Sequence, residues 1–175
     1  MDSRRIRDAS PDDAAACAAV YAPYVLGSTA TFELEPPSTA EMADRIAAAQ
    51  ERHAWLVLED DGVLVGYAYG GPFKARPAYR WTCEVSVYLA QDRRSAGSGR
   101  VLYTALLDRL AARGYRTAAA GMTQPNEPSA ALHRALGFTE VGTFRRVGWK
   151  LGGWHDVTWV QRDLAVGDDP PAEPR

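Results

Sequence analysis

The sequence predicts a mixed α/β fold of the α+β kind, in which a central β-sheet carries helices on both faces. Apolar runs with strand and helix periodicity follow one another in the order β-α-α-β-β-β-α-β-α-β-β. Asp61-Gly62 lies between two strand-like runs and predicts a hairpin. A purely parallel, doubly wound sheet would not contain that hairpin, so only the two late strand–helix–strand units need parallel crossovers.

Composition narrows the class of protein. The 175 residues are enough for one domain with a complete core, and a net charge of −2 gives no basic field for nucleic acid. The sequence shows neither an apolar signal run nor a stretch of membrane-spanning length, so we expect a cytoplasmic protein without a membrane partner. Cys17 and Cys83 lie in apolar surroundings and are expected to be reduced core residues. The histidines and cysteines lack ligand spacing, so we expect no metal.

The first half of the chain is expected to give one strand, two helices and a hairpin. Ser10 precedes Pro11, and proline suits the first turn of a helix. Ser38 and Glu41 form a capping box in sequence, which predicts the start of a second helix. The long loop between the helices holds Phe32, which is expected to be buried. The expected elements are a strand over 4–7, helices over 10–24 and from 38 onward, and strands over 55–58 and 63–69.

The second half is expected to alternate strands and helices. Gly114 is the expected C-cap of one helix, and Asn126 or Ser129 is the expected N-cap of the next, which Gly137 closes. The expected elements are an irregular segment over 73–80, a strand over 81–89, a helix over 101–112, a strand over 115–121, a short helix, and antiparallel strands over 138–147 and 156–162. Residues 1–166 are predicted to form one domain, and residues 167–175, rich in proline and charge, to be disordered.

A glycine-rich turn between the strand over 81–89 and the helix over 101–112 is the most informative stretch. Gly97 and Gly99 have no Cβ, so a ligand can approach their backbone. The amides of the first helical turn and the helix dipole favour an anion there. Arg93, Arg94 and Arg100 add positive charge. We expect a pyrophosphate, although the spacing matches neither a Walker A loop nor a dinucleotide fingerprint.

Glu84 is the strongest single candidate for a catalytic residue. Side chains alternate along a strand, so Glu84, Ser86 and Tyr88 share one face, and Cys83 and Val85 share the apolar one. A carboxylate within a strand is unusual, because an unpaired charge is costly to bury. One interpretation is a solvated residue or a partner for an arginine. The other is a general base whose pKa is raised by partial burial.

Two segments resemble blocks of the Gcn5-related N-acetyltransferase (GNAT) superfamily. The spacing Arg94-x-x-Gly97-x-Gly99 is similar to its acyl-CoA loop, and the segment from Asn126 to Phe138 is similar to its last block. In that block a tyrosine that protonates the departing thiolate commonly stands where this chain has His133, and the asparagine bonds the pantetheine arm. A lone helical histidine is more often structural, and Asn126 could equally be only an N-cap.

Further segments resemble the phosphinothricin N-acetyltransferases, so that the resemblance extends over roughly residues 4–164. They are residues 71–84, residues 148–157, and the loop of residues 28–32 followed by Glu35-Pro36. The chain departs from that pattern in having Val85 after the glutamate where serine is usual, Phe73 in place of tryptophan, and Ser95 and Ala96 in the pyrophosphate loop.

The resemblance implies the GNAT fold, acetyl-CoA as co-substrate and direct transfer of the acetyl group in a ternary complex. Glu84 would be the base, His133 the acid, and a backbone N–H near Val87 would stabilise the oxyanion. The family is also dimeric, and the aromatic segment over 149–159, expected to be irregular, offers apolar surface for a homodimer. Acetyl-CoA is expected to bind at Val87, Tyr88, Leu89, Arg94, Ser95, Ala96, Gly97, Ser98, Gly99, Arg100 and Asn126.

The expected acceptor is a small, anionic, amino-acid-like molecule of the phosphinothricin or methionine sulfoximine type. Lys74, Arg76 and Arg80 lie a few residues before Glu84, and arginine suits bidentate binding of carboxylate or phosphinate oxygens. The same cations could instead be a solvated surface. Phe32 and Phe73 complete the expected acceptor residues.

Two other classes of function stay open on the sequence. A protein N-terminal or lysine acetyltransferase would share the acyl-CoA loop but would need an open peptide groove. A non-catalytic CoA-binding sensor would keep the glycine-rich loop but would need neither Glu84 nor His133.

Overall fold

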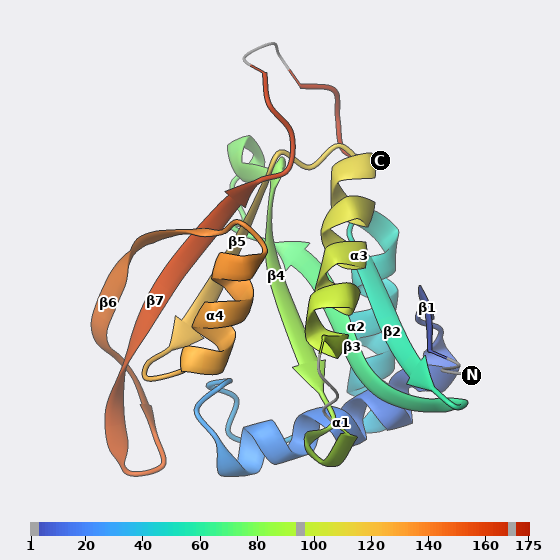
Figure 1. Ribbon diagram of the computed structural model, residues 1–175, viewed down its shortest axis with the longest axis vertical. Coiled ribbons are helices and arrows are strands. Elements are labelled where there is room, and N and C mark those ends of the chain that lie inside the picture. The colour runs from blue at the N-terminus through green and yellow to red at the C-terminus, as the bar shows by residue number, and fades with distance from the viewer. Residues whose placement is uncertain (1–3, 94–96, 168–170) are drawn as a thin grey trace.

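The computed structural model describes residues 4–93, 97–167 and 171–175 (Figure 1). In the described residues a seven-stranded mixed sheet has the order β1-β2-β3-β4-β5-β7-β6, which confirms the predicted fold class. The elements are β1 (Arg5–Asp8), α1 (Ala14–Gly27), α2 (Thr39–Arg52), β2 (Ala54–Asp60), β3 (Val63–Pro72), β4 (Thr82–Leu89), α3 (Ser98–Ala112), β5 (Thr117–Thr123), α4 (Glu127–Ala135), β6 (Thr139–Lys150) and β7 (Gly153–Asp163), with short 3-10 turns at Pro11–Asp13, Pro77–Tyr79 and Gln91–Arg93.

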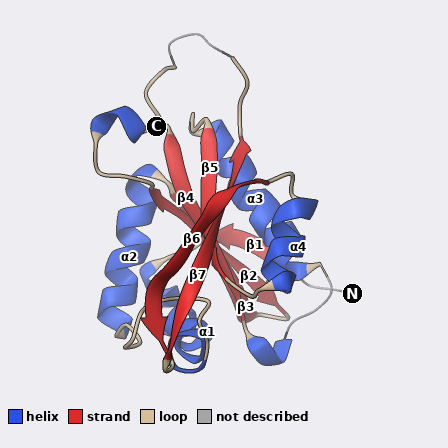
Figure 2. Cartoon of the chain, turned by 90° about the vertical axis from the view of Figure 1, so that its left-hand side faces the viewer, coloured by secondary structure: helices blue, strands red, loops and turns tan. Residues whose placement is uncertain are grey.

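Helices cover both faces of the sheet, as Figure 2 shows with α2 on one side and α3 and α4 on the other. Alternate residues of β2 divide between two cores, because successive side chains of a strand point to opposite faces. Trp55 and Val57 pack with α1 and α2, whereas Leu56 and Leu58 pack with α3. β4 follows the same rule: Cys83 and Val85 lie in the α3 core, so the predicted face of Glu84, Ser86 and Tyr88 is the one towards α1 and α2.

The predicted end of the first helix was short by about one turn. α1 continues to Gly27 although Pro23, which has no backbone N–H, lies within it. Burial of Tyr24 and Val25 against the α2 side of the sheet outweighs that loss. The second helix begins as predicted: Ser38 Oγ accepts from Glu41 N at 3.2 Å, and Ser38 N donates to Glu41 Oε2 at 2.7 Å.

The last two strands are longer than predicted, and the segment over 149–159 is not irregular. Trp149 faces Trp154 across the β6–β7 hairpin, whose register shifts further along, between Phe144 and Gly148. Leu151 and Gly152 form its tight turn, with φ of 50° and 77°, the left-handed pair that suits a twisted hairpin.

Of the two expected parallel crossovers, one joins strands that pair directly with each other. β4 and β5 pair in parallel around α3. β6 does not reach β5, because β7 inserts between them and pairs antiparallel with both. In the β5–α4–β6 unit, α4 therefore lies beside β5, while β6 lies at the edge of the sheet (Figure 1).

The described end of the chain contacts the body of the protein. Ala172 O accepts from Trp81 Nε1 at 2.8 Å, and Arg175 N donates to Arg113 O at 2.8 Å. Glu173 forms an ion pair with Arg80 at 2.8 Å. The disorder expected over 167–175 and the single domain over 1–166 stay predictions.

Three further features bear on the protein class. Within the described ranges, the helices are too short or too polar to cross a membrane. The same residues contain no cluster of three or more His, Cys, Asp or Glu side chains suited to a metal ion. Cys17 and Cys83 are both buried as free thiols.

Candidate active site

The central feature of the site is a fork in the sheet, where β4 and β5 part. Their described ladder consists of three residue pairs, the last of which is Glu84 with Ala119. Beyond that pair β4 stays paired to β3, up to Leu89, and β5 stays paired to β7, up to Thr123. Each strand therefore keeps its outer neighbour and turns its inner backbone edge towards the gap, where a ligand can satisfy it.

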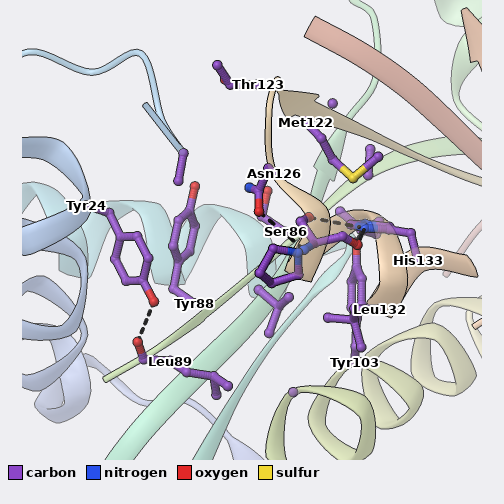
Figure 3. A pocket seen from close by; sticks show the side chains of 18 residues that line it. Tyr24, Ser86, Tyr88, Leu89, Tyr103, Met122, Thr123, Asn126, Leu132 and His133 are labelled. Carbon is purple, nitrogen blue, oxygen red and sulfur yellow. Dashed lines mark hydrogen bonds between the residues drawn. The ribbon is translucent and has the colours of Figure 1, made fainter. Parts of the chain in front are cut away.

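A cavity of about 320 Å³ fills the fork. Figure 3 shows Tyr24 and Tyr88 on one side of it and Tyr103 and His133 on the other. Tyr24 Oη donates to Leu89 O at 2.6 Å and so ties α1 to the end of β4. Of the predicted acetyl-CoA residues, those that line the cavity are Val87, Tyr88, Leu89, Gly99 and Asn126.

Glu84 lies at the closed end of the fork, on the face towards α1 and α2. Its side chain is partly buried and makes no hydrogen bond with the described residues. Burial raises the pKa of the Glu84 carboxyl, and the ammonium of Lys74 opposes that rise. A partly desolvated carboxyl without a hydrogen-bond partner accepts a proton more readily than an exposed glutamate, as a general base must.

The glycine-rich turn leads into the start of α3, where the sequence predicted an anion site. Gly97 has φ of 88°, a left-handed conformation that favours glycine, and α3 begins at Ser98. At Gly99 a Cβ would lie 3.4 Å from Leu89 Cδ1. The first amides of this helix have no intrahelical acceptor, so they suit phosphate oxygens. Ser98 is buried and Arg100 is exposed, whereas Arg94, Ser95 and Ala96 lie outside the described residues.

His133 is buried, at 5% exposure, on the opposite side of the sheet from Glu84. Its Nδ1 lies 2.8 Å from Ser129 O, and a carbonyl can only accept, so Nδ1 carries the proton. In the neutral ring Nε2 then accepts from Tyr103 Oη, 3.1 Å away. Burial lowers the pKa of His133, against the Ser129 hydrogen bond, which raises it. The resting histidine is therefore neutral and presents no N–H of its own to the cavity.

Asn126 has the capping role that the sequence left open. Its Oδ1 accepts from Ser129 N at 3.3 Å and starts α4. The side chain also lines the cavity, and the cap uses only its oxygen. Capping and a contact to the pantetheine arm are thus compatible.

The basic segment before Glu84 borders a second cavity, of about 670 Å³, between α2 and β3. Phe73, Lys74, Arg76 and Arg80 line it, as does Gly71, the cross-strand partner of Glu84. Its other walls are aromatic and include a stack in which Trp55 and Tyr69 are 4.5 Å apart, centroid to centroid. The cavity thus lies on the same face as the candidate base.

The predicted acceptor residues are not all brought together. Phe32 belongs to neither lining and packs on Gly148 of β6 instead. The expectation that Phe32 is buried was wrong, because β6 is the edge strand and the ring stays 36% exposed there. Arg80 lies over the Trp81 ring at 4.1 Å and is paired with Glu173. Of the basic segment, Lys74 interacts electrostatically with Glu84 and lowers the pKa of its carboxyl.

The sequence reasoning missed several residues of the fork. Tyr103 lies one helical turn after Gly99 and is completely buried, so helical spacing from the predicted loop could have found it. Trp159 of β7 lies over Gly121 of β5, where a Cβ would come within 3.3 Å of the indole. Other lining residues that were not predicted are Tyr24, Ser86, Met122, Thr123, Ser129 and Leu132.

Known proteins share this architecture. A model of the acetyltransferase (GNAT) domain matches residues 6–159. A phosphinothricin N-acetyltransferase of Streptomyces viridochromogenes is 44% identical over 170 residues, which cover 97% of this chain and 91% of that protein. An L-methionine sulfoximine/L-methionine sulfone acetyltransferase of Pseudomonas paraeruginosa is 36% identical, over 93% of this chain and 95% of that protein.

A solved structure agrees with the fold and with the ligand. The phosphinothricin acetyltransferase of Sinorhizobium meliloti, determined in complex with acetyl-CoA, matches with a TM-score of 0.93 at 37% identity, covering 98% of this chain and 94% of that one. These relatives confirm the predicted acetyltransferase class and acetyl-CoA as its co-substrate. Since the domain model and the Streptomyces relative both extend over most of the sequence, this chain belongs to the GNAT acetyltransferase family, among the phosphinothricin N-acetyltransferases.

Proposed function

We propose that this enzyme acetylates the α-amine of a small anionic amino-acid analogue, of the phosphinothricin or methionine sulfoximine type, by direct attack in a ternary complex. The observation that carries the proposal is the fork between β4 and β5 with Glu84 at its closed end. The names of the Streptomyces and Pseudomonas relatives support the acceptor class.

The reaction needs one proton removed and one supplied. Glu84 takes a proton from the acceptor ammonium, directly or through water, and the free amine attacks the thioester carbonyl. The C–N bond forms, the C–S bond breaks, and the backbone N–H groups near Val87 stabilise the oxyanion. Cys17 and Cys83 are not needed as nucleophiles, and burial raises the pKa of both thiols to about 12.

The departing thiolate takes its proton from the α3–α4 side of the fork. Tyr103 Oη lines the cavity and is bonded to His133 Nε2. A proton from solvent adds to His133 Nε2, which then donates to Tyr103 Oη, while Tyr103 gives its own proton to the thiolate. Transfer of the Nε2 proton to Tyr103 returns both residues to their resting forms. In this arrangement His133 acts through Tyr103.

The acceptor is held by charge in the cavity beside Glu84. Lys74 and Arg76 bind its carboxylate and its side-chain oxyanion, which fixes the amine near the thioester. A cationic polyamine is repelled by the same segment. A protein acetyltransferase would instead favour a peptide, and a non-catalytic CoA sensor would release no thiol with any acceptor.

We also propose a homodimer in the cytoplasm. The β6–β7 hairpin exposes large apolar side chains that water contacts unfavourably. The buried free thiols agree with a reducing compartment. The exposed fractions are 62% for Phe144, 56% for Trp149, 62% for Leu151 and 52% for Trp154.

Glu84→Gln should lower kcat by about 100-fold or more, because the general base is lost while the shape is kept. In the wild type the raised pKa of Glu84 places the acid limb of the kcat/KM profile above the ordinary glutamate range, since the base must be ionised to work. The variant should lose that limb. Thermal unfolding checks the fold, and Glu140→Gln, at an exposed carboxylate of β6, is the control. Near-normal turnover of Glu84→Gln would refute the assignment.

The acceptor proposal is tested by comparing kcat/KM for phosphinothricin, methionine sulfoximine, spermidine and a short peptide, with thiol release as the signal. The anionic analogues should be preferred. Arg76→Ala should raise their KM more than it lowers kcat, because it removes binding common to ground and transition states. Arg5→Ala, at an exposed arginine of β1, should change neither constant. A preference for spermidine or peptide would overturn the acceptor class and leave the acetyltransferase reaction standing.

The wild type should show the mass of a dimer by light scattering at micromolar concentration. Trp149→Glu should shift it to the monomer, because a charge would be buried in the proposed contact. A monomeric wild type would contradict the proposal.

A further inference from the structure

We propose that Lys150 of β6 is a positioning residue that fastens the loop between α1 and α2 to the β6–β7 hairpin and thereby sets how well the acceptor binds. The loop comprises residues 28–33 and carries Phe32. The effect on acceptor binding rests on the proposed function, whereas the attachment of the loop to β6 rests on the contacts described next.

Lys150 is a buried cation whose ammonium donates to main-chain carbonyls. It is 4% exposed, and its Nζ donates to Thr31 O at 2.7 Å and to Tyr24 O at 3.5 Å. These carbonyls are 119 and 126 residues away in sequence. A buried ammonium loses its hydration, and hydrogen bonds within the protein must replace it. The bonds that replace it here attach Lys150 to the end of α1 and to the loop.

The end of α1 explains why a cation is placed there. The last carbonyls of a helix have no intrahelical donor and carry the negative end of the helix dipole. The last turn of α1 contains no basic residue of its own. Lys150 supplies that charge from β6, and Ser28 Oγ adds a donor to the Tyr24 carbonyl at 3.0 Å.

A second contact joins the same two segments two residues earlier on β6. The Phe32 ring lies directly on Gly148, where a Cβ would come within 2.2 Å of the ring. Phe32 also lies near His155 of β7, with 6.3 Å between ring centroids. His155 in turn bonds Lys150 O through Nε2 at 2.8 Å. The β6–β7 hairpin therefore contacts the loop of residues 28–33 twice, through the Lys150 hydrogen bond to Thr31 O and through the packing of Phe32 on Gly148.

The held loop is part of the site wall. Tyr24 and Ala30 line the cavity of the fork. The loop also reaches the second cavity, in which we place the acceptor. Thr31 Oγ1 bonds Tyr21 Oη at 2.7 Å, and Tyr21 lines that cavity while its ring packs on Tyr88 of β4, with centroids 4.9 Å apart. If Lys150 is neutralised, the Thr31 carbonyl loses its charged donor and this wall loosens. The acceptor must then order the loop when it binds, so its KM rises more than its kcat falls.

The experiment compares Lys150→Met with the wild type by hydrogen exchange and by kinetics. In Lys150→Met the amides of residues 28–33 should lose protection while those of β3 keep it. The KM of the preferred acceptor should rise about tenfold, the size expected when a charge-assisted hydrogen bond is removed. Arg145→Met removes an exposed cation from the same strand, and both its exchange and its KM should match the wild type.

Two further variants keep the test decisive. Gly148→Ala leaves the ammonium in place but expels the Phe32 ring, and it should raise the acceptor KM in the same way. Lys150→Gln keeps an N–H donor without the charge, and it replaces Lys150→Met if that variant does not fold.

Unchanged protection of residues 28–33 in the folded Lys150 variant would overturn the proposal, and so would an unchanged acceptor KM beside lost protection. A loss of kcat with KM unaltered would contradict it as well. If the wild type acetylates none of the tested acceptors, the proposed function fails, whereas the exchange comparison still decides whether Lys150 holds the loop.

Discussion

The structure depends on one constraint, the parting of β4 from β5 after the Glu84–Ala119 pair. Every other part of the site follows from it. The outer ladders to β3 and β7 keep both strands rigid while their inner edges face a cavity. The turn at Gly97 then starts α3 beside the open end of the fork, where helix amides suit a pyrophosphate. A continuous seven-stranded ladder would have no room for a thioester.

The fork also lets the two faces of the sheet take different chemical roles. Glu84 belongs to the face covered by α1 and α2, whereas His133 and Tyr103 belong to the face covered by α3 and α4. In our proposal the base and the proton supply therefore approach the reacting carbonyl from opposite faces. Burial raises the pKa of the Glu84 carboxyl, which favours its role as the base. Burial keeps His133 neutral at rest, so the histidine has to take up a proton during turnover before it can supply one.

The sequence was informative where one segment determines its own structure. Strand alternation placed Glu84 opposite Cys83. The glycine pattern located the junction between strand and helix, although α3 begins at Ser98, three residues before its predicted start at residue 101. It was less informative where distant segments meet. The partner of His133 Nε2 is a tyrosine 30 residues away, and the position of the Phe32 ring depends on Gly148. Neither contact leaves a local pattern in the sequence.

The most direct test of the account is a crystal structure with acetyl-CoA bound. The acetyl carbonyl should lie between β4 and β5, just beyond the Glu84–Ala119 pair, with the pyrophosphate on the amides that follow Gly97. An acetyl group bound outside the fork, or a β4–β5 ladder that closes past Glu84 when the ligand is present, would contradict it.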